Sequence, residues 1–138
     1  MHHITRASLT VLSGAMLFSL ATPLGANASP SSTTYLYNCS TRSQRPHEII
    51  LTCADANTYV TNIRWSHWSQ ASAHARGTLH WNTCTPTCVA GTRRSTTINF
   101  VATHRRKVKG VWLYTELAAT TRTWHSGSAV VTLPTSPL

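Results

Sequence analysis

The clearest pattern of hydrophobic and polar positions along the chain is an alternation between Ala73 and Asn82. Small or apolar residues occupy every second position of this segment, namely Ala73, Ala75, Gly77, Leu79 and Trp81. His, Arg, Thr and Asn fill the positions between them. Because successive side chains of a strand point to opposite faces of a sheet, this pattern predicts a strand with one buried and one solvated face.

Shorter runs of β-branched and aromatic residues recur along the chain, separated by Gly, Pro and Asn. Together with the alternating segment they predict seven strands, at Tyr35–Asn38, Glu48–Cys53, Tyr59–His67, Ala73–Asn82, Thr96–Thr103, Val111–Ala118 and Ala129–Leu133. After residue 28 the sequence contains no internal repeat, heptad or convincing amphipathic helix. These features predict an all-β fold, a small antiparallel β-sandwich or barrel of about seven strands.

Two neighbouring segments depart from simple alternation. In Val111–Ala118, Trp112 and Tyr114 alternate with aliphatic residues, which predicts a strand buried on both faces. The segment before it, His104–Gly110, consists mainly of bases and ends in glycine. We expect an exposed hairpin loop there.

The first 28 residues have the features of an export signal. Basic residues precede the apolar stretch Leu9–Ala21, and Ala26-Asn27-Ala28 has the small residues that suit a signal peptidase. The apolar stretch is too short for a stable membrane anchor, so we expect cleavage near Ala28 and a secreted protein that either stays associated with the cell wall or diffuses away. 

The chain therefore divides into a signal peptide at 1–28, a single β domain at 29–133 and a flexible tail at 134–138.

The sequence after Ala28 is strongly basic. Removal of Arg6 with the leader leaves 11 of the 12 Lys and Arg against three acids, Glu48, Asp55 and Glu116, a formal charge of 11 − 3 = +8. Mechanisms that need two carboxylates in one site are disfavoured by so few acids. A surface of this kind attracts polyanions at low salt.

Four cysteines form an even set in a chain that we expect to be exported, which favours disulfides. Three pairings are possible, and we favour Cys39–Cys53 with Cys84–Cys88, because Pro86 bends the short loop between the last two. Crossed pairing stays open. Disulfides would offset a thin aliphatic core, since Leu, Ile, Val and Phe make up only 19 of the 110 residues after Ala28.

A metal site is the alternative use of these cysteines. Cys84 and Cys88 have His74 and His80 nearby in the sequence, and these are ligand types that zinc accepts. The other two cysteines are fourteen residues apart, whereas structural zinc sites usually combine two closely spaced pairs. We therefore expect disulfides, no metal and no cofactor.

Two basic segments are the strongest functional signal. They contain Arg93 and Arg94 in the first, and Arg105, Arg106, Lys107 and Lys109 in the second. Both flank the strand predicted at Thr96–Thr103, so they lie at opposite ends of it unless the sheet bends. The residues favour two interpretations equally: a basic surface that only keeps the protein soluble, or a site for an anionic polysaccharide, teichoic acid or nucleic acid outside the cell.

The tryptophans also have two interpretations. Trp65, Trp68 and Trp81 could form a platform that stacks on sugars or bases, but a domain poor in aliphatic residues needs such rings in its core. Trp65 and Trp81 share strand parity with aliphatic neighbours, which favours burial. Trp68 lies near a strand end, and we expect it to be exposed and to join the ligand-binding residues.

Catalysis has weaker support. His67, His74, His80, His104 and His125 accompany no recognised nucleophile motif. Asp55, two residues before Asn57, could bind a hydroxyl, a sugar or a cation, but this spacing is more typical of a turn. We predict no catalytic residue and a monomer. The alternatives are a protein-binding module or hydrolase inhibitor that presents the Cys84–Cys88 loop, and a small hydrolase that uses Asp55 with a histidine.

A series of short motifs runs through the middle of the chain, over about Cys39–Leu117. It comprises Cys39, Arg45-Pro46, Ile49-Ile50-Leu51, Cys53-Ala54-Asp55-Ala56-Asn57, Ile63-Arg64-Trp65, Trp68, Ala73–Gly77, Asn82, Cys84-Thr85-Pro86-Thr87-Cys88, Ala90-Gly91 and Tyr114-Thr115. In these motifs the chain resembles a family of small exported proteins of actinobacteria that has no assigned activity. Relatives typically have an aromatic residue and Tyr-Pro-Val where this chain has Arg93–Ile98. The resemblance implies export, a compact β domain and disulfides.

Overall fold

The computed structural model describes residues 32–120, Trp124 and residues 127–138. The predicted signal peptide lies outside these residues. The described strands are β1 (Thr34–Asn38), β2 (Thr41–Ser43), β3 (Ile49–Ile50), β4 (Thr58–Ser66), β5 (Ala73–Asn82), β6 (Arg93–Thr103), β7 (Arg106–Val108), β8 (Val111–Leu113), β9 (Glu116–Ala119) and β10 (Val130–Thr132). The described part of the chain forms no helix, and so none long and apolar enough to cross a membrane.

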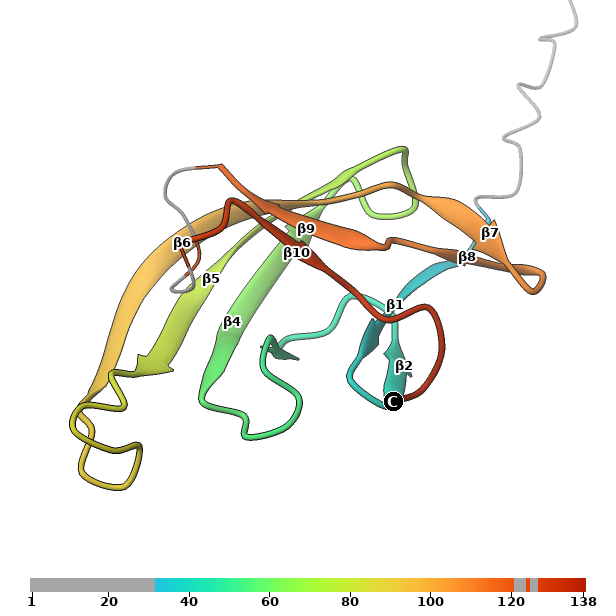
Figure 1. Ribbon diagram of the computed structural model, residues 1–138. Helices are drawn as coiled ribbons and strands as arrows, with labels where there is room; N and C mark the ends of the chain where they lie inside the picture. The colour runs from blue at the N-terminus through green and yellow to red at the C-terminus, as the bar shows by residue number, and fades with distance from the viewer. Residues whose placement is uncertain (1–31, 121–123, 125–126) are drawn as a thin grey trace, which may run out of the picture.

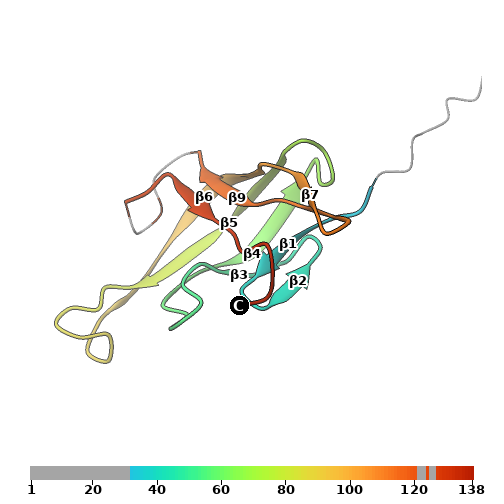
Figure 2. The ribbon, with the colours of Figure 1, turned by 45° about the vertical axis from the view of Figure 1, so that its right-hand side comes forward.

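The strands form two sheets, which confirms the predicted all-β class. The larger sheet has the order β10-β9-β6-β5-β4-β3, is antiparallel throughout, and curls into a half-barrel (Figures 1 and 2). The smaller sheet has the order β2-β1-β8-β7, and its β1 and β8 run parallel, which the sequence did not indicate. β6 passes from one side of the molecule to the other (Figure 1). The residues at its two ends therefore lie on opposite sides of the fold.

The strand predicted at Val111–Ala118 is interrupted. β8 ends at Leu113 and belongs to the smaller sheet, whereas β9 begins at Glu116 in the larger one. Tyr114 and Thr115 connect them, and both are buried. Burial on both faces, which the sequence indicated, arises here because the chain passes between the two sheets.

The basic segment predicted as a hairpin loop contains a strand. β7 pairs with β8, and only Lys109 and Gly110 form the turn between them. Both have positive φ, 46° and 84°, which is typical of a two-residue type I′ turn. The short β7 lies at the edge of its sheet, where charged side chains oppose pairing with other chains. This explains why its composition resembles that of a loop.

Aromatic rings fill much of the core. Trp65 meets Trp68 and Phe100 edge to face, with ring centroids 4.7 Å and 5.4 Å apart, and Trp68 meets Tyr114 in the same way at 5.2 Å. Phe100 also meets Trp124, at 5.5 Å. One of these rings, Tyr114, lies in the connection between the two sheets. A few large rings thus supply apolar area that the small number of aliphatic residues does not provide.

The prediction that Trp68 is exposed is wrong. Only 7% of Trp68 is accessible to solvent, and its indole N–H donates to the carbonyl of Thr34, 3.0 Å away. The chain turns sharply at His67, where φ is 57°, so alternation along β4 does not continue to residue 68. The turn places the ring in the core, and Trp68 is not available to stack on a ligand.

A bulge in β4 sets the direction of its side chains. Its pairing with β5 shifts register between Thr61 and Arg64, and Asn62 has a φ of 54°. Val60 before the bulge and Ile63 after it are therefore both buried, while Arg64 is exposed. The single extra residue thus decides which face of the sheet receives Arg64.

Gly77 of β5 lies close to this part of β4. A Cβ atom at Gly77 would lie 2.7 Å from Cγ1 of Val60 and 2.9 Å from the carbonyl oxygen of Thr61. Because the second neighbour belongs to the backbone, we expect Gly77→Ala to lower the free energy of unfolding by about 1–3 kcal/mol. Ser95→Ala, on the exposed part of β6, is the control, with a change within about 0.5 kcal/mol. Equal urea midpoints for the two variants would contradict the close approach.

Candidate anion-binding site

The positive charge of the described residues is not compensated by carboxylates. Of the 12 Lys and Arg in the sequence, Arg6 and Arg122 lie outside the described residues, which leaves ten. None of these ten forms an ion pair with a described acid, since the pair found joins His104 Nδ1 to Glu116 Oε2 at 3.3 Å. Their charge is therefore not neutralised by an acid among the described residues.

The first predicted basic segment begins β6 and does not lie in a loop. Arg93 pairs with Asn82 and Arg94 with Trp81, and both arginines are exposed. They lie where β5 and β6 extend away from the rest of the larger sheet (Figure 1). The strand begins at Arg93 and not at the predicted Thr96, because its pairing with β5 extends toward the N-terminus beyond the β-branched residues.

The second basic segment lies at the other end of β6, in the β7–β8 hairpin. Arg106, Lys107 and Lys109 are exposed there. The strand between the two segments spans ten residue steps, from Arg93 to Thr103, or about 33 Å at roughly 3.3 Å per residue. The curl of the sheet leaves these ends on opposite sides of the molecule (Figure 1). The two segments therefore do not form one patch.

Arg105 contacts other parts of the fold. Its Nε donates to the hydroxyl of Thr34 at 2.8 Å, and its Nη2 donates to the carbonyl and hydroxyl oxygens of Ser32. The guanidinium carbon lies 4.2 Å from the ring centroid of Trp112, a cation–π arrangement. These contacts hold the start of β1 against the hairpin, so Arg105 differs from the exposed bases with which the sequence grouped it.

A third basic region lies on the outer face of the larger sheet. Arg64 of β4 and Arg76 of β5 are direct cross-strand partners, and both are exposed. Like charges at such positions repel and cost up to about 1 kcal/mol. The two arginines line a hollow of about 330 Å³, which we call the sheet-face hollow. Its other lining residues are Ser66, His74, Ala75, Asn99, Phe100 and Thr120. No acid is among the residues lining it.

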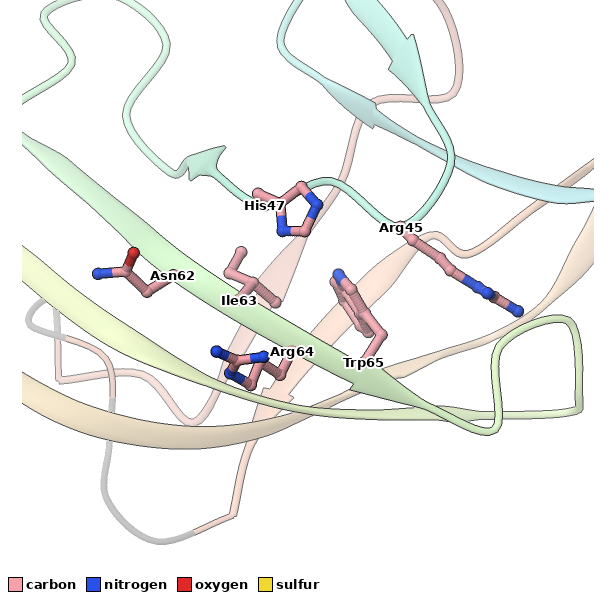
Figure 3. A pocket seen from close by; sticks show the side chains of 6 residues that line it. All are labelled: Arg45, His47, Asn62, Ile63, Arg64 and Trp65. Atoms are coloured by element: carbon pink, nitrogen blue, oxygen red, sulfur yellow. The ribbon is translucent and has the colours of Figure 1, made fainter.

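A second hollow adjoins the first through Arg64. It has a volume of about 410 Å³ and lies between β4 and the segment that precedes β3, where Arg45 and His47 join Asn62, Arg64 and Trp65 (Figure 3). The backbone N–H of Ile63 donates to the carbonyl of His47 at 3.0 Å, which holds the two walls together. Basic side chains thus line both hollows, from the sheet face to the segment that precedes β3.

Sequence reasoning found only part of this outer face. Alternation along β5 correctly placed His74 and Arg76 on its solvated side. It did not identify Arg64 as a site residue, because its position opposite Arg76 depends on the bulge and on the pairing of β4 with β5. The sequence did show one arginine in each of the two strands, Arg64 and Arg76. It did not show the strand register that places them opposite each other.

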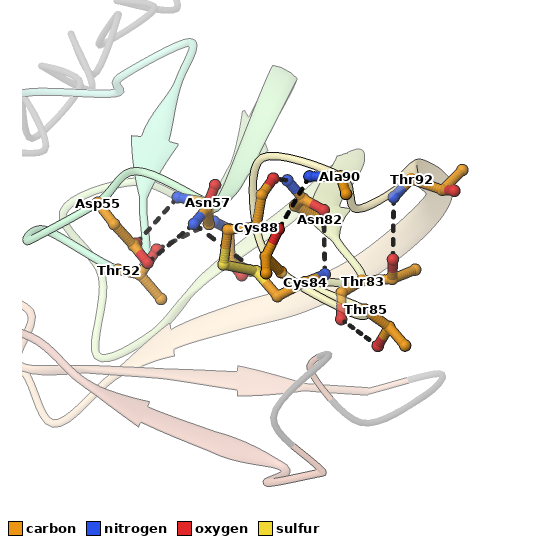
Figure 4. The surroundings of a disulfide bond; sticks show 12 residues. Thr52, Asp55, Asn57, Asn82, Thr83, Cys84, Thr85, Cys88, Ala90 and Thr92 are labelled. Atoms are coloured by element: carbon orange, nitrogen blue, oxygen red, sulfur yellow. Dashed lines mark hydrogen bonds between the residues drawn. A yellow bond between two sulfur atoms is a disulfide. The ribbon is translucent and has the colours of Figure 1, made fainter.

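The favoured disulfide pairing is confirmed. Cys39 and Cys53 are bonded with Cα atoms 5.6 Å apart. Cys84 and Cys88 are bonded with Cα atoms 3.7 Å apart, and Figure 4 shows the surroundings of this second bond. No cysteine is free. Among the described residues no group of three or more His, Cys, Asp or Glu is placed to hold a metal ion.

Asn82 supports the Cys84–Cys88 loop. We expected its side chain on the solvated face of β5, but Asn82 is only 8% exposed, so that assignment is wrong. Its Nδ2 donates to the carbonyl of Cys88 at 2.7 Å, and its Oδ1 accepts from the backbone N–H of Cys84 at 3.0 Å (Figure 4). Both ends of the loop are thereby tied to β5, and the loop shields the amide from solvent.

Asp55 forms the turn that its spacing from Asn57 predicted. Its Oδ1 accepts the backbone N–H of Asn57 at 3.0 Å, and its Oδ2 accepts from Asn57 Nδ2 at 2.9 Å (Figure 4). The backbone N–H of Asn57, followed by the side chain of Thr52, lowers the pKa of Asp55 below its usual value of 3.8. The carboxylate therefore stabilises a loop.

The described histidines do not gather in one cluster, although two of them are in contact. His80 lies 2.9 Å from the hydroxyl of Thr61 and stacks on Tyr59, with centroids 4.8 Å apart. The rings of His67 and His74 meet edge to face at 5.7 Å, beside the sheet-face hollow that His74 lines. His125 lies outside the described residues.

Comparisons with known proteins return no matching family model, no matching curated protein and no matching solved structure. The resemblance to exported actinobacterial proteins and the predicted export therefore stay predictions.

Acid titration tests the role of Asp55. The fold favours its charged form, so Asp55 stabilises the protein above its usual pKa of 3.8, and this contribution is lost as pH falls through the lower pKa of the folded state. We expect the free energy of unfolding to fall more steeply below about pH 4 in the wild type than in Asp55→Asn. Parallel urea titrations measure this, and identical slopes would contradict the assigned hydrogen bonds.

Replacement of Arg105 separates its structural contacts from the exposed charge of the hairpin. Arg105→Ser removes the bonds to Ser32 and Thr34 and the contact with Trp112, and we expect it to lower the free energy of unfolding by about 1–3 kcal/mol. Lys107→Ser is the matched control, with a change within about 0.5 kcal/mol because this side chain is exposed. Thermal or urea unfolding of both variants gives the comparison.

Proposed function

We propose that the protein is a non-catalytic binding protein for an anionic polymer outside the cell, such as a wall or surface polysaccharide, a teichoic acid or extracellular nucleic acid. One observation carries the proposal: none of the ten described Lys and Arg is paired with a described carboxylate. Cations that make no internal ion pair retain their attraction for external anions, and each phosphate that they neutralise releases counterions.

The separation of the basic regions favours a long ligand over a small one. The end of β6 with Arg93 and Arg94, the sheet face with Arg64 and Arg76, and the β7–β8 hairpin lie along one extended strand and its neighbours. A polymer that carries many charges can contact several such regions at once. Linked weak contacts then produce a stronger overall attachment than any one region alone.

Protein binding through the Cys84–Cys88 loop is the second candidate. The loop is closed by its disulfide and held by Asn82, and Val89 beside it is fully exposed. A loop that is already ordered loses little entropy when it binds. Stoichiometric inhibition of a secreted hydrolase that persists at high salt would favour this candidate over polymer binding.

A salt series tests the polymer proposal. We expect teichoic acid, polyuronate or single-stranded DNA to retain the protein at low salt and to release it as salt rises, because phosphate or carboxylate contacts displace counterions. Replacement of Arg106, Lys107 and Lys109 by Ser should weaken binding and reduce the slope of log K against log salt by roughly 2–3.

Neutral replacements at exposed positions provide the control. Ser40→Ala with Ser95→Ala leaves the charge unchanged, so retention and slope should match the wild type. Retention that is the same at low and high salt would reject the electrostatic proposal. Binding that survives the triple hairpin substitution unchanged would reject the hairpin as a contact region.

A further inference from the structure

The side chains of the paired arginines in the sheet-face hollow have no partner among the residues that the structure describes. Arg64 and Arg76 face each other across adjacent strands, and the side chain of neither forms a hydrogen bond or ion pair with a described residue. Positive groups at directly opposite positions of two strands repel each other, and an anion that attracts both offsets this repulsion. The hollow therefore has a charge arrangement that a bound anion would stabilise.

The neighbouring side chains in the hollow add hydrogen-bond donors. Ser66 and His74 form a cross-strand pair two positions further along β4 and β5, and both line the hollow. A hydroxyl and an imidazole N–H can each donate to an anion. On the opposite side, the backbone N–H and hydroxyl of Thr120 donate to the carbonyl of Asn99, at 2.9 Å and 3.1 Å, which fixes the wall next to β9.

The arrangement of donors favours one chemical class of anion. A carboxylate has two oxygens in one plane, which a single arginine can engage in a bidentate pair. A tetrahedral oxyanion directs its oxygens out of any single plane, so guanidinium groups from two strands can contact it together with a hydroxyl. The hollow offers donors from two adjacent strands, and its lining includes no acid that would repel an anion.

We infer that the hollow lined by Arg64, Ser66, His74 and Arg76 binds one tetrahedral oxyanion group, a phosphate or sulfate. The inference rests on the proposed function, since it names the charged group that the polymer would carry. β4, β5 and β6 position these residues through long antiparallel ladders, so only side chains need to become ordered on binding.

Titration of the full chain with small anions tests this site. The probes are inorganic phosphate, sulfate and acetate at equal ionic strength, followed by the NMR signals of the arginine Nε–H groups. We expect saturable shifts at Arg64 and Arg76 with phosphate or sulfate, and weaker binding of acetate by about tenfold. The tighter of the two tetrahedral anions identifies a phosphate-bearing or a sulfate-bearing polymer.

Charge-conserving variants distinguish a site from general attraction. Arg64→Lys and Arg76→Lys keep the positive charge and lose the planar fork, so each should weaken phosphate or sulfate binding by about tenfold. Arg94→Lys, near the far end of β6, is the matched control and should change it less than about twofold. Circular dichroism of the lysine variants checks that the fold is retained.

The outcomes separate this inference from the proposed function. Equal affinity for acetate, unchanged affinity in both lysine variants, or shifts spread equally over Arg93 and Arg106 would overturn the oxyanion site. Polymer retention in the salt series would still stand in those cases. Conversely, saturable binding of phosphate without retention on any anionic polymer would reject the polymer proposal and keep the site.

Discussion

The packing of aromatic rings between the two sheets is the interaction on which the rest of the structure depends. Trp65, Trp68, Phe100 and Tyr114 form successive ring contacts inside the curled sheet. Aliphatic residues are few, so these rings supply much of the apolar area that folding buries. Tyr114 lies where the chain passes between the sheets, and its hydroxyl donates to the carbonyl of Gln70 at 2.8 Å, which ties the turn after β4 to the core.

Because the large apolar residues lie in the core, polar and basic residues occupy the outer face of the larger sheet. The acids do not neutralise it. Asp55 accepts hydrogen bonds within a turn, and Glu116 lies beside His104 at the end of β6. The arginines of the outer face consequently have no carboxylate partner among the described residues. The scarcity of acids thus has two consequences: it disfavours mechanisms that need two carboxylates in one site, and it supports the proposed affinity for anionic polymers.

Local rules accounted well for features that depend on neighbouring residues. Alternation identified β5 with its correct bounds, the short Cys-Thr-Pro-Thr-Cys loop indicated its own disulfide, and the spacing of Asp55 and Asn57 predicted a turn. The same rules failed for Trp68 and Asn82, because a sharp turn redirects the first side chain and a folded-back loop covers the second. They also missed β7, whose charged composition reflects its position at a sheet edge.

The sequence by itself determined the strand-forming pattern and the excess of positive charge, because each depends on residue type and short spacing. It favoured one of three cysteine pairings, and the structure decided for that one. Only the tertiary structure decided which charges lie together. It separated Arg93 and Arg94 from the hairpin bases, engaged Arg105 within the fold, and set Arg64 opposite Arg76. Strand register, the bulge in β4 and the length of β6 determine which basic residues lie close together. All three depend on contacts between residues far apart in the chain.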